Sequence, residues 1–127
     1  MRLQPFVAVD GTPFSASRDD VLRERGAPAR QARNEVGLDE LDYGHVVFRF
    51  QRSGRLEEVT ARAQVVELGT VAVPFGSLEP FVRAQDPQAF ERAGFVVSPA
   101  FGLAFDPREA CWVTALARHC LAQWRAL

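Results

Sequence analysis

Residues 9–28 read VDGTPFSASRDDVLRERGAP, and the local signals in this stretch agree with one another. Ser17 can accept a hydrogen bond from the free backbone N–H groups at a helix start, and Asp20 completes a variant of the capping box. Gly26 suits the left-handed position after a helix, and Pro28 prevents its continuation. The stretch therefore predicts a strand, a turn and a capped helix that stops at Gly26.

Beyond this helix, the sequence indicates hairpins. Residues 29–40 are polar and predict the longest loop, whereas residues 46–50 alternate as a strand with one face against a core. Leu56 and Val59 fall on opposite parities of the strand expected over 55–61, so this strand needs either a bulge or burial on both faces.

The second half is expected to repeat this order. We expect strands over 65–68 and 71–75, a helix from Ser77 and a short helix between 87 and 94. Strands should follow over 95–97, 101–105 and 110–116. Apolar spacing in the tail also fits a helix, but the residues around Trp112 favour extended structure, so we expect a strand to about Leu116 and a helix after it.

The two halves share a short pattern of glycine, proline and serine. Residues 11–15 read GTPFS, and residues 69–77 contain GT and then PFGS. An internal duplication would explain this similarity, and so would the chance recurrence of short sequence patterns. Either way, the predicted class is α+β, with a two-layer antiparallel sheet covered on one face by two or three short helices.

Length and composition indicate one domain over residues 1–127. There are 15 basic and 16 acidic residues, so the net charge of −1 provides no field for holding nucleic acid. No segment approaches the ~20 apolar residues of a membrane span, and the first residues lack a signal-peptide core. Two cysteines suit a reducing compartment, so we expect a cytoplasmic protein.

The residues that usually carry chemistry do not form a recognisable site. His45 and His119 belong to no metal-binding spacing, and Cys120 lies on the apolar stripe of the tail, where a cysteine is usually a core residue. Adjacent helical residues point about 100 degrees apart, which argues against a pair of His119 and Cys120. Glu57 and Glu58 should face opposite sides of a strand. We therefore expect no catalytic residue, metal or cofactor.

Charge distribution offers a hint of binding. Acidic residues follow a basic segment and run into a strand, where they can steer a basic protein partner or form a solvated loop. The candidate partner-binding residues are Glu35, Asp39, Glu40, Asp42, Tyr43 and Arg49. Tyr43 and Arg49 are the expected anchors, since aromatic and arginine side chains dominate interfaces.

A family resemblance rests on residues spread over nearly the whole chain. These are Pro5-Phe6, Val9-Asp10-Gly11, Phe14-Ser15, Ser17-Arg18, Asp20-Val21, Gly26, Pro28, Asp42-Tyr43, Asp86, Gly94, Ser98, Gly102 and Pro107. The pattern resembles a family of small bacterial α+β proteins, some of which are similar to immunity proteins that bind toxins. The order of helix and hairpin is also similar to domains of the β-lactamase inhibitor protein and of small outer-membrane assembly lipoproteins, which bind proteins.

This resemblance implies a protein-binding module that neutralises a bacterial toxin by occlusion. The alternative is a small-molecule-binding or enzymatic domain with a pocket between helices and sheet and His45 near its mouth. A third hypothesis is homodimerisation through the tail that carries Trp112 and Trp124. The expected partner is another protein, and the expected state is a monomer or a weak homodimer.

Overall fold

Strands hold more residues of the protein than helices do, and its computed structural model describes residues 1–127. In chain order the elements are β1 (Arg2–Gln4), β2 (Ala8–Val9), β3 (Thr12–Pro13), α1 (Arg18–Arg25), β4 (Arg30–Arg33), β5 (Asp39–Asp42), β6 (Val46–Phe50), β7 (Leu56–Arg62), β8 (Val65–Leu68), β9 (Val71–Pro74), α2 (Phe75–Gln85), β10 (Phe90–Arg92), β11 (Phe95–Ser98), β12 (Leu103–Phe105), β13 (Trp112–Leu116), the 3-10 helix η1 (Arg118–Cys120) and α3 (Leu121–Arg125). None of the helices has the length and apolar character needed to cross a membrane.

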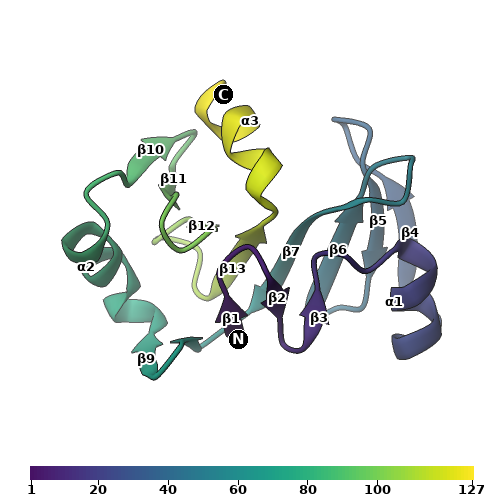
Figure 1. Ribbon diagram of the computed structural model, residues 1–127, viewed down its shortest axis with the longest axis horizontal. Helices are drawn as coiled ribbons and strands as arrows, with labels where there is room; N and C mark the ends of the chain where they lie inside the picture. Colours follow the sequence, from purple (N-terminus) through teal and green to yellow (C-terminus); the bar gives the residue numbers. More distant parts are fainter.

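The strands form two sheets (Figure 1). The small sheet has the order β3-β2-β1-β8-β9, and the large sheet has the order β10-β11-β12-β13-β7-β6-β5-β4. Only β1 and β8 pair in parallel. The predicted single sheet with a helical cover is therefore wrong, because thirteen strands in two sheets outweigh three short helices.

The order of strand, helix and antiparallel strands occurs twice along the chain. The helix α1 leads into the meander β4-β5-β6-β7, and α2 leads into the meander β10-β11-β12-β13. The two meanders join edge to edge, because β7 pairs with β13. In Figure 1, α1 lies at one end of this arrangement and α2 at the other, with α3 between them.

The structure confirms the predicted helix that is capped at Ser17 and stops at Gly26, which is α1. The Asp20 backbone N–H donates to Ser17 Oγ at 3.1 Å, and the Ser17 N–H donates to the Asp20 carboxylate at 2.9 Å. Gly26 has φ of 79°, and its N–H donates to the Leu22 carbonyl at 2.8 Å. Both ends of the helix thus satisfy backbone groups that would otherwise lack partners.

The predicted polar loop over 29–40 is wrong, because its residues form the hairpin β4-β5. Asn34 builds the turn, where its side-chain oxygen accepts from the backbone N–H groups of Val36 at 3.1 Å and Leu38 at 2.9 Å. The polar sequence is compatible with a strand at this position, because β4 lies at the edge of the sheet and its residues are exposed. Charged side chains on an edge discourage pairing with further chains.

The second half departs from expectation at one segment. The short helix predicted between 87 and 94 is wrong, because these residues form the hairpin β10-β11 around a turn at Ala93-Gly94. Asp86, which precedes this segment, accepts hydrogen bonds from the backbone of Gln88 and Ala100 and from the Ser98 hydroxyl. The helix expected from Ser77 begins at Phe75, and the tail is a strand followed by helix, as predicted.

The core lies between the large sheet and a layer made by the small sheet, α1 and α2. Its largest cluster joins side chains from both sheets with Val21 of α1 and with Leu78 and Val82 of α2. The predicted strand 46–50 is confirmed, and Phe48 and Phe50 face this core. We call the face of the large sheet that points into this core the inner face and the opposite one the outer face.

The outer face is covered over only part of its width. A second cluster joins Val97, Ala104 and Leu116 of this face to Cys120, and Trp124 of α3 packs against it. Helix α3 therefore covers the strands β11 to β13 and leaves the outer face of β4 to β7 outside this apolar layer.

A bulge in β7 explains why Leu56 and Val59 are both buried although they fall on opposite parities of the strand. Arg49 pairs with Glu58 and Phe50 pairs with Leu56, so Glu57 is the extra residue of the bulge. Only 1% of Glu57 is exposed. A bulge re-aims side chains, and here Glu57 is buried against Cys120 of η1 while Glu58 stays on the outer face.

Candidate functional site

A row of polar side chains crosses the outer face of the large sheet. Glu40, Arg49 and Glu58 lie side by side on β5, β6 and β7 in the register of the ladder. The Arg49 Nε–H donates to the Glu40 carboxylate at 2.7 Å, and its Nη1 donates to the Thr60 hydroxyl at 2.6 Å and lies 3.7 Å from the Glu58 carboxylate. The Thr60 and Thr114 hydroxyls are 2.8 Å apart. The row thus links four neighbouring strands.

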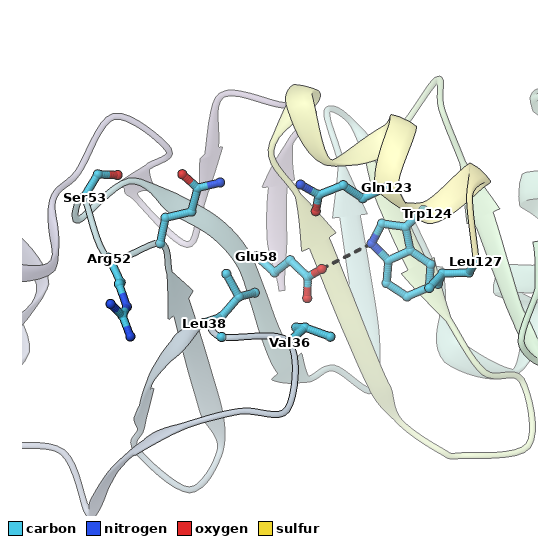
Figure 2. A pocket seen from close by; sticks show the side chains of 10 residues that line it. Val36, Leu38, Arg52, Ser53, Glu58, Gln123, Trp124 and Leu127 are labelled. Carbon is cyan, nitrogen blue, oxygen red and sulfur yellow. Dashed lines mark hydrogen bonds between the residues drawn. The ribbon is translucent and has the colours of Figure 1, made fainter.

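A cavity of about 620 Å³ opens beside this row (Figure 2). Its walls come from the β4-β5 turn, the β6-β7 turn and the end of α3, and Glu58 lies between them. The lining residues are Val36, Gly37, Leu38, Gln51, Arg52, Ser53, Glu58, Gln123, Trp124 and Leu127. A second cavity of about 310 Å³ also touches Glu58 and Trp124 and extends to Thr60, Phe95 and Trp112. We call the two cavities together the outer groove.

The indole of Trp124 divides the outer groove. Its Nε1–H donates to Glu58 Oε1 at 3.2 Å, as the dashed line in Figure 2 shows. Its ring meets Phe95 edge to face, with centroids 5.3 Å apart. Trp124, considered in the sequence as part of a dimer surface, is thus engaged within the chain and anchors α3 to the sheet.

The groove combines an acidic floor with an exposed apolar rim. Val36 is 79% exposed and Leu127 is 69% exposed, and both line the same cavity. On the floor lie Glu58 and Arg49, and the guanidinium of Arg49 also pairs with Glu40 beside the groove. Burial raises the pKa of Glu58, although the charge of Arg49 and the Trp124 hydrogen bond oppose this shift. The floor can therefore accept a cation or a hydrogen-bond donor between apolar walls.

The structure separates the six predicted binding residues. Only Glu40 and Arg49 contact each other, and of these two Arg49 lines the groove. Glu35 is exposed in the β4-β5 turn next to the rim residue Val36, while Asp39 pairs with Arg33 at 3.2 Å. Asp42 accepts from the Gly44 backbone N–H at 2.8 Å and shapes the next turn.

Tyr43, a predicted anchor, makes two contacts within the fold. Its hydroxyl donates to the Gly26 carbonyl at 2.9 Å, and its ring meets Phe48 edge to face at 6.0 Å between centroids. It therefore ties the C-terminal end of α1 to the large sheet.

The change Tyr43→Phe removes this hydrogen bond and keeps the ring. We expect it to lower the free energy of unfolding by about 0.5–1.5 kcal/mol, measured by urea denaturation. Affinity for a partner bound in the outer groove should stay the same, because Tyr43 does not line it. Unchanged stability with weakened binding would return Tyr43 to the interface.

Sequence reasoning missed Glu58, Trp124 and Val36. A regular strand would put Glu57 and Glu58 on opposite faces, so the sequence did not suggest Glu58 as part of a site. Trp124 lies 66 residues from Glu58 in the sequence, and no local pattern connects the two. Val36 carried a usable signal, since it is an isolated apolar residue in a polar turn.

A second polar cluster lies below the surface at the bulge. The Glu57 carboxylate contacts His119 Nε2, and it accepts from the Cys120 thiol at 2.7 Å. Burial raises the pKa of the Cys120 thiol, and its hydrogen bond to Glu57 raises it further. Cys120 is thus a thiol, and as such a poor nucleophile. The sequence argues against a direct pair of His119 and Cys120, and the structure instead brings both side chains to the carboxylate of Glu57.

Comparison of the chain with protein-family models, with curated proteins and with solved structures gives no match. The resemblance to immunity proteins is therefore carried by the sequence pattern alone, and it stays a prediction.

Proposed function

We propose that this chain is a protein-binding module of the immunity type, which neutralises a bacterial toxin by occluding it. The outer groove is the proposed binding surface. One observation carries the proposal: the exposed rim residues Val36 and Leu127 stand beside Trp124 over an acidic floor. An exposed apolar patch with polar surroundings is typical of a protein interaction site.

The composition of the groove defines the partner segment. Glu40 and Glu58 outnumber Arg49, so the row carries one excess negative charge when all three are ionised. A basic side chain flanked by apolar residues matches this floor and rim. The toxin would supply such a segment, and its active site would be blocked by the groove and the surrounding turns.

The arrangement of elements also supports binding. The repeated order of helix and antiparallel strands is the feature on which the likeness to the β-lactamase inhibitor protein rests. The groove is built from turns and from α3, which are held by a continuous sheet. A rigid surface of this kind loses little conformational entropy on binding. We place this activity in the cytoplasm.

The change Val36→Lys tests the groove with little risk to folding, because the side chain is exposed on a turn. The probe is the protein encoded beside this gene, co-expressed and then titrated against the purified chain. We expect Val36→Lys to weaken the complex at least about tenfold, which corresponds to ~1.4 kcal/mol, because it removes an apolar rim contact and repels a basic partner segment. Protection of cells from that protein should fall with it.

The matched control is Val7→Lys. Val7 is 58% exposed and does not line the outer groove, so this change adds the same charge elsewhere. Its affinity should equal that of the unmodified chain. Equal weakening by both changes would reject the groove as the interface. If the neighbouring protein forms no complex and causes no toxicity that this chain relieves, the immunity function is wrong.

One observation favours the alternative, a small-molecule-binding domain. A cavity of about 550 Å³ lies between the N-terminal segment, the β6-β7 turn and η1, and His119 is in its wall. We call it the His119 cavity. His45, expected at the mouth of such a pocket, is instead exposed in the β5-β6 turn. NMR shifts confined to Phe6, Ser17 and His119 during a fragment screen would support this function.

A further inference from the structure

Three potential metal ligands meet although they come from distant parts of the chain. Glu57 lies in the bulge of β7, and His119 and Cys120 lie in η1. One ligand atom of each lies within 4.8 Å of the other two. Cys120 Sγ and His119 Nε2 both contact the same atom, Oε2 of Glu57.

The backbone holds these ligands in place. The Ala117 N–H donates to the Glu57 carbonyl at 2.9 Å, so the start of η1 is tied to the bulge. The Cys120 thiol also lies 3.3 Å from this carbonyl. The cluster thus belongs to a fixed contact between β7 and η1, and it does not depend on a mobile loop.

The two oxygens of Glu57 have different surroundings. Oε1 faces the Arg55 guanidinium at 3.4 Å, whereas Oε2 faces the imidazole and the thiol. A buried carboxylate is costly unless it is paired or coordinates a metal. Arg55 is exposed, so it compensates the charge only in part. This division leaves Oε2 as the ligand oxygen and Oε1 as the atom that Arg55 orients.

We propose that Glu57, His119 and Cys120 bind a divalent cation of the zinc class. Thiolate, imidazole and carboxylate are the ligands that zinc takes, at about 2.0–2.3 Å. Two such ligands on a tetrahedral ion lie roughly 3.3–3.8 Å apart, which the three donor atoms reach by small side-chain rotations. On binding, the Cys120 thiol releases its proton to solvent.

The fourth position on the metal faces the His119 cavity. The His119 side chain is 32% exposed, and it lines this cavity together with Arg55 and Arg118. Three protein ligands with one open position are typical of zinc sites that bind water or a ligand group. Since two arginines line the cavity, a water or an anionic group such as a carboxylate fits this position.

Titration of the full chain with Co²⁺ and Zn²⁺ tests the site. We expect one Co²⁺ per chain, with visible bands of tetrahedral cobalt and a thiolate charge-transfer band in the near ultraviolet. Zn²⁺ should displace the Co²⁺ and raise the melting temperature. His119→Gln should weaken Zn²⁺ binding at least about tenfold, and Cys120→Ser should abolish the thiolate band.

The matched control is Cys111→Ser, which removes the only other cysteine. This variant should keep the thiolate band and the affinity for Zn²⁺. Absence of a thiolate band in the unmodified chain, or its loss in Cys111→Ser, overturns the proposal. So does unchanged Zn²⁺ affinity in His119→Gln, which decides the question even if Cys120→Ser does not fold. Val36→Lys should bind Zn²⁺ normally, so failure of the groove proposal is separable from failure of this one.

Discussion

Replacing Phe48 with alanine is expected to lower the free energy of unfolding by about 3–5 kcal/mol. Phe48 is 1% exposed and lies at the centre of β6, between Leu41 on β5 and Val59 on β7. The Arg25 guanidinium is 4.9 Å from its ring centre. The change opens a cavity where α1 meets the large sheet, and neighbours on a rigid sheet cannot fill it. Urea denaturation followed by circular dichroism measures the loss.

Two further variants serve as controls for Phe48→Ala. Phe48→Leu keeps most of the apolar volume and should cost less than half as much as alanine. Val7→Ala removes an exposed apolar side chain and should change stability by no more than about 0.5 kcal/mol. A loss under 1 kcal/mol for Phe48→Ala would show that this part of the interior repacks, contrary to the described core.

Replacing Asp86 with alanine is the second large change, with an expected loss of about 2–4 kcal/mol. Asp86 is 2% exposed, and its carboxylate accepts three hydrogen bonds. The donors are the Ser98 hydroxyl at 2.7 Å and the backbone N–H groups of Gln88 at 2.9 Å and Ala100 at 3.0 Å. Alanine leaves these donors without a partner, and the segments around Gln88 and Ala100 lose their hydrogen bonds to the end of α2.

The effect of Asp86 should depend on pH. Burial by itself would raise the pKa of Asp86, but the hydrogen bonds from Ala100, Ser98 and Gln88 outweigh it and lower the pKa below its usual 3.8. A carboxyl group with a lowered pKa in the folded state contributes stability above the unfolded value and loses it as the pH falls through the folded value. The difference between the native chain and Asp86→Ala should therefore be complete at pH 6 and shrink below pH 3.8.

Gln88→Ala is the matched control for Asp86. Gln88 is exposed in the same loop, and it donates to Asp86 through its backbone, which the substitution keeps. Its stability should stay within about 0.5 kcal/mol of the native chain at every pH. If the loss in Asp86→Ala is the same at pH 3 and pH 6, the ionised carboxylate is not what holds these loops.

The candidate site was only partly visible in the sequence. Glu40 and Arg49 were selected for their charge, and the register of β5 and β6 brings them together. Tyr43 was selected as an aromatic anchor, and its hydroxyl donates to the Gly26 carbonyl at the end of α1. Charge and residue type indicate that a side chain can bind, whereas its burial and its partners decide whether it is free to do so.

The helix α1 with its two caps, the alternating strand β6 and the strand-to-helix tail were determined by the sequence itself. These features depend on residues a few positions apart, so hydrogen bonds and periodicity within one segment specify them. The second sheet and the hairpins in the polar segments were decided by the tertiary structure. Polar residues suit an edge strand as well as a loop, and only pairing with a neighbour distinguishes the two.

Both proposed sites depend on contacts that no local signal contains. The bulge at Glu57 breaks the alternation of β7, and Glu57 contacts His119, which lies 62 residues away in the sequence. The groove arises beside α3, where Trp124 reaches Glu58 of β7. Such contacts form only when burial of the whole core sets the register of the strands, and for this reason the tertiary structure alone places them.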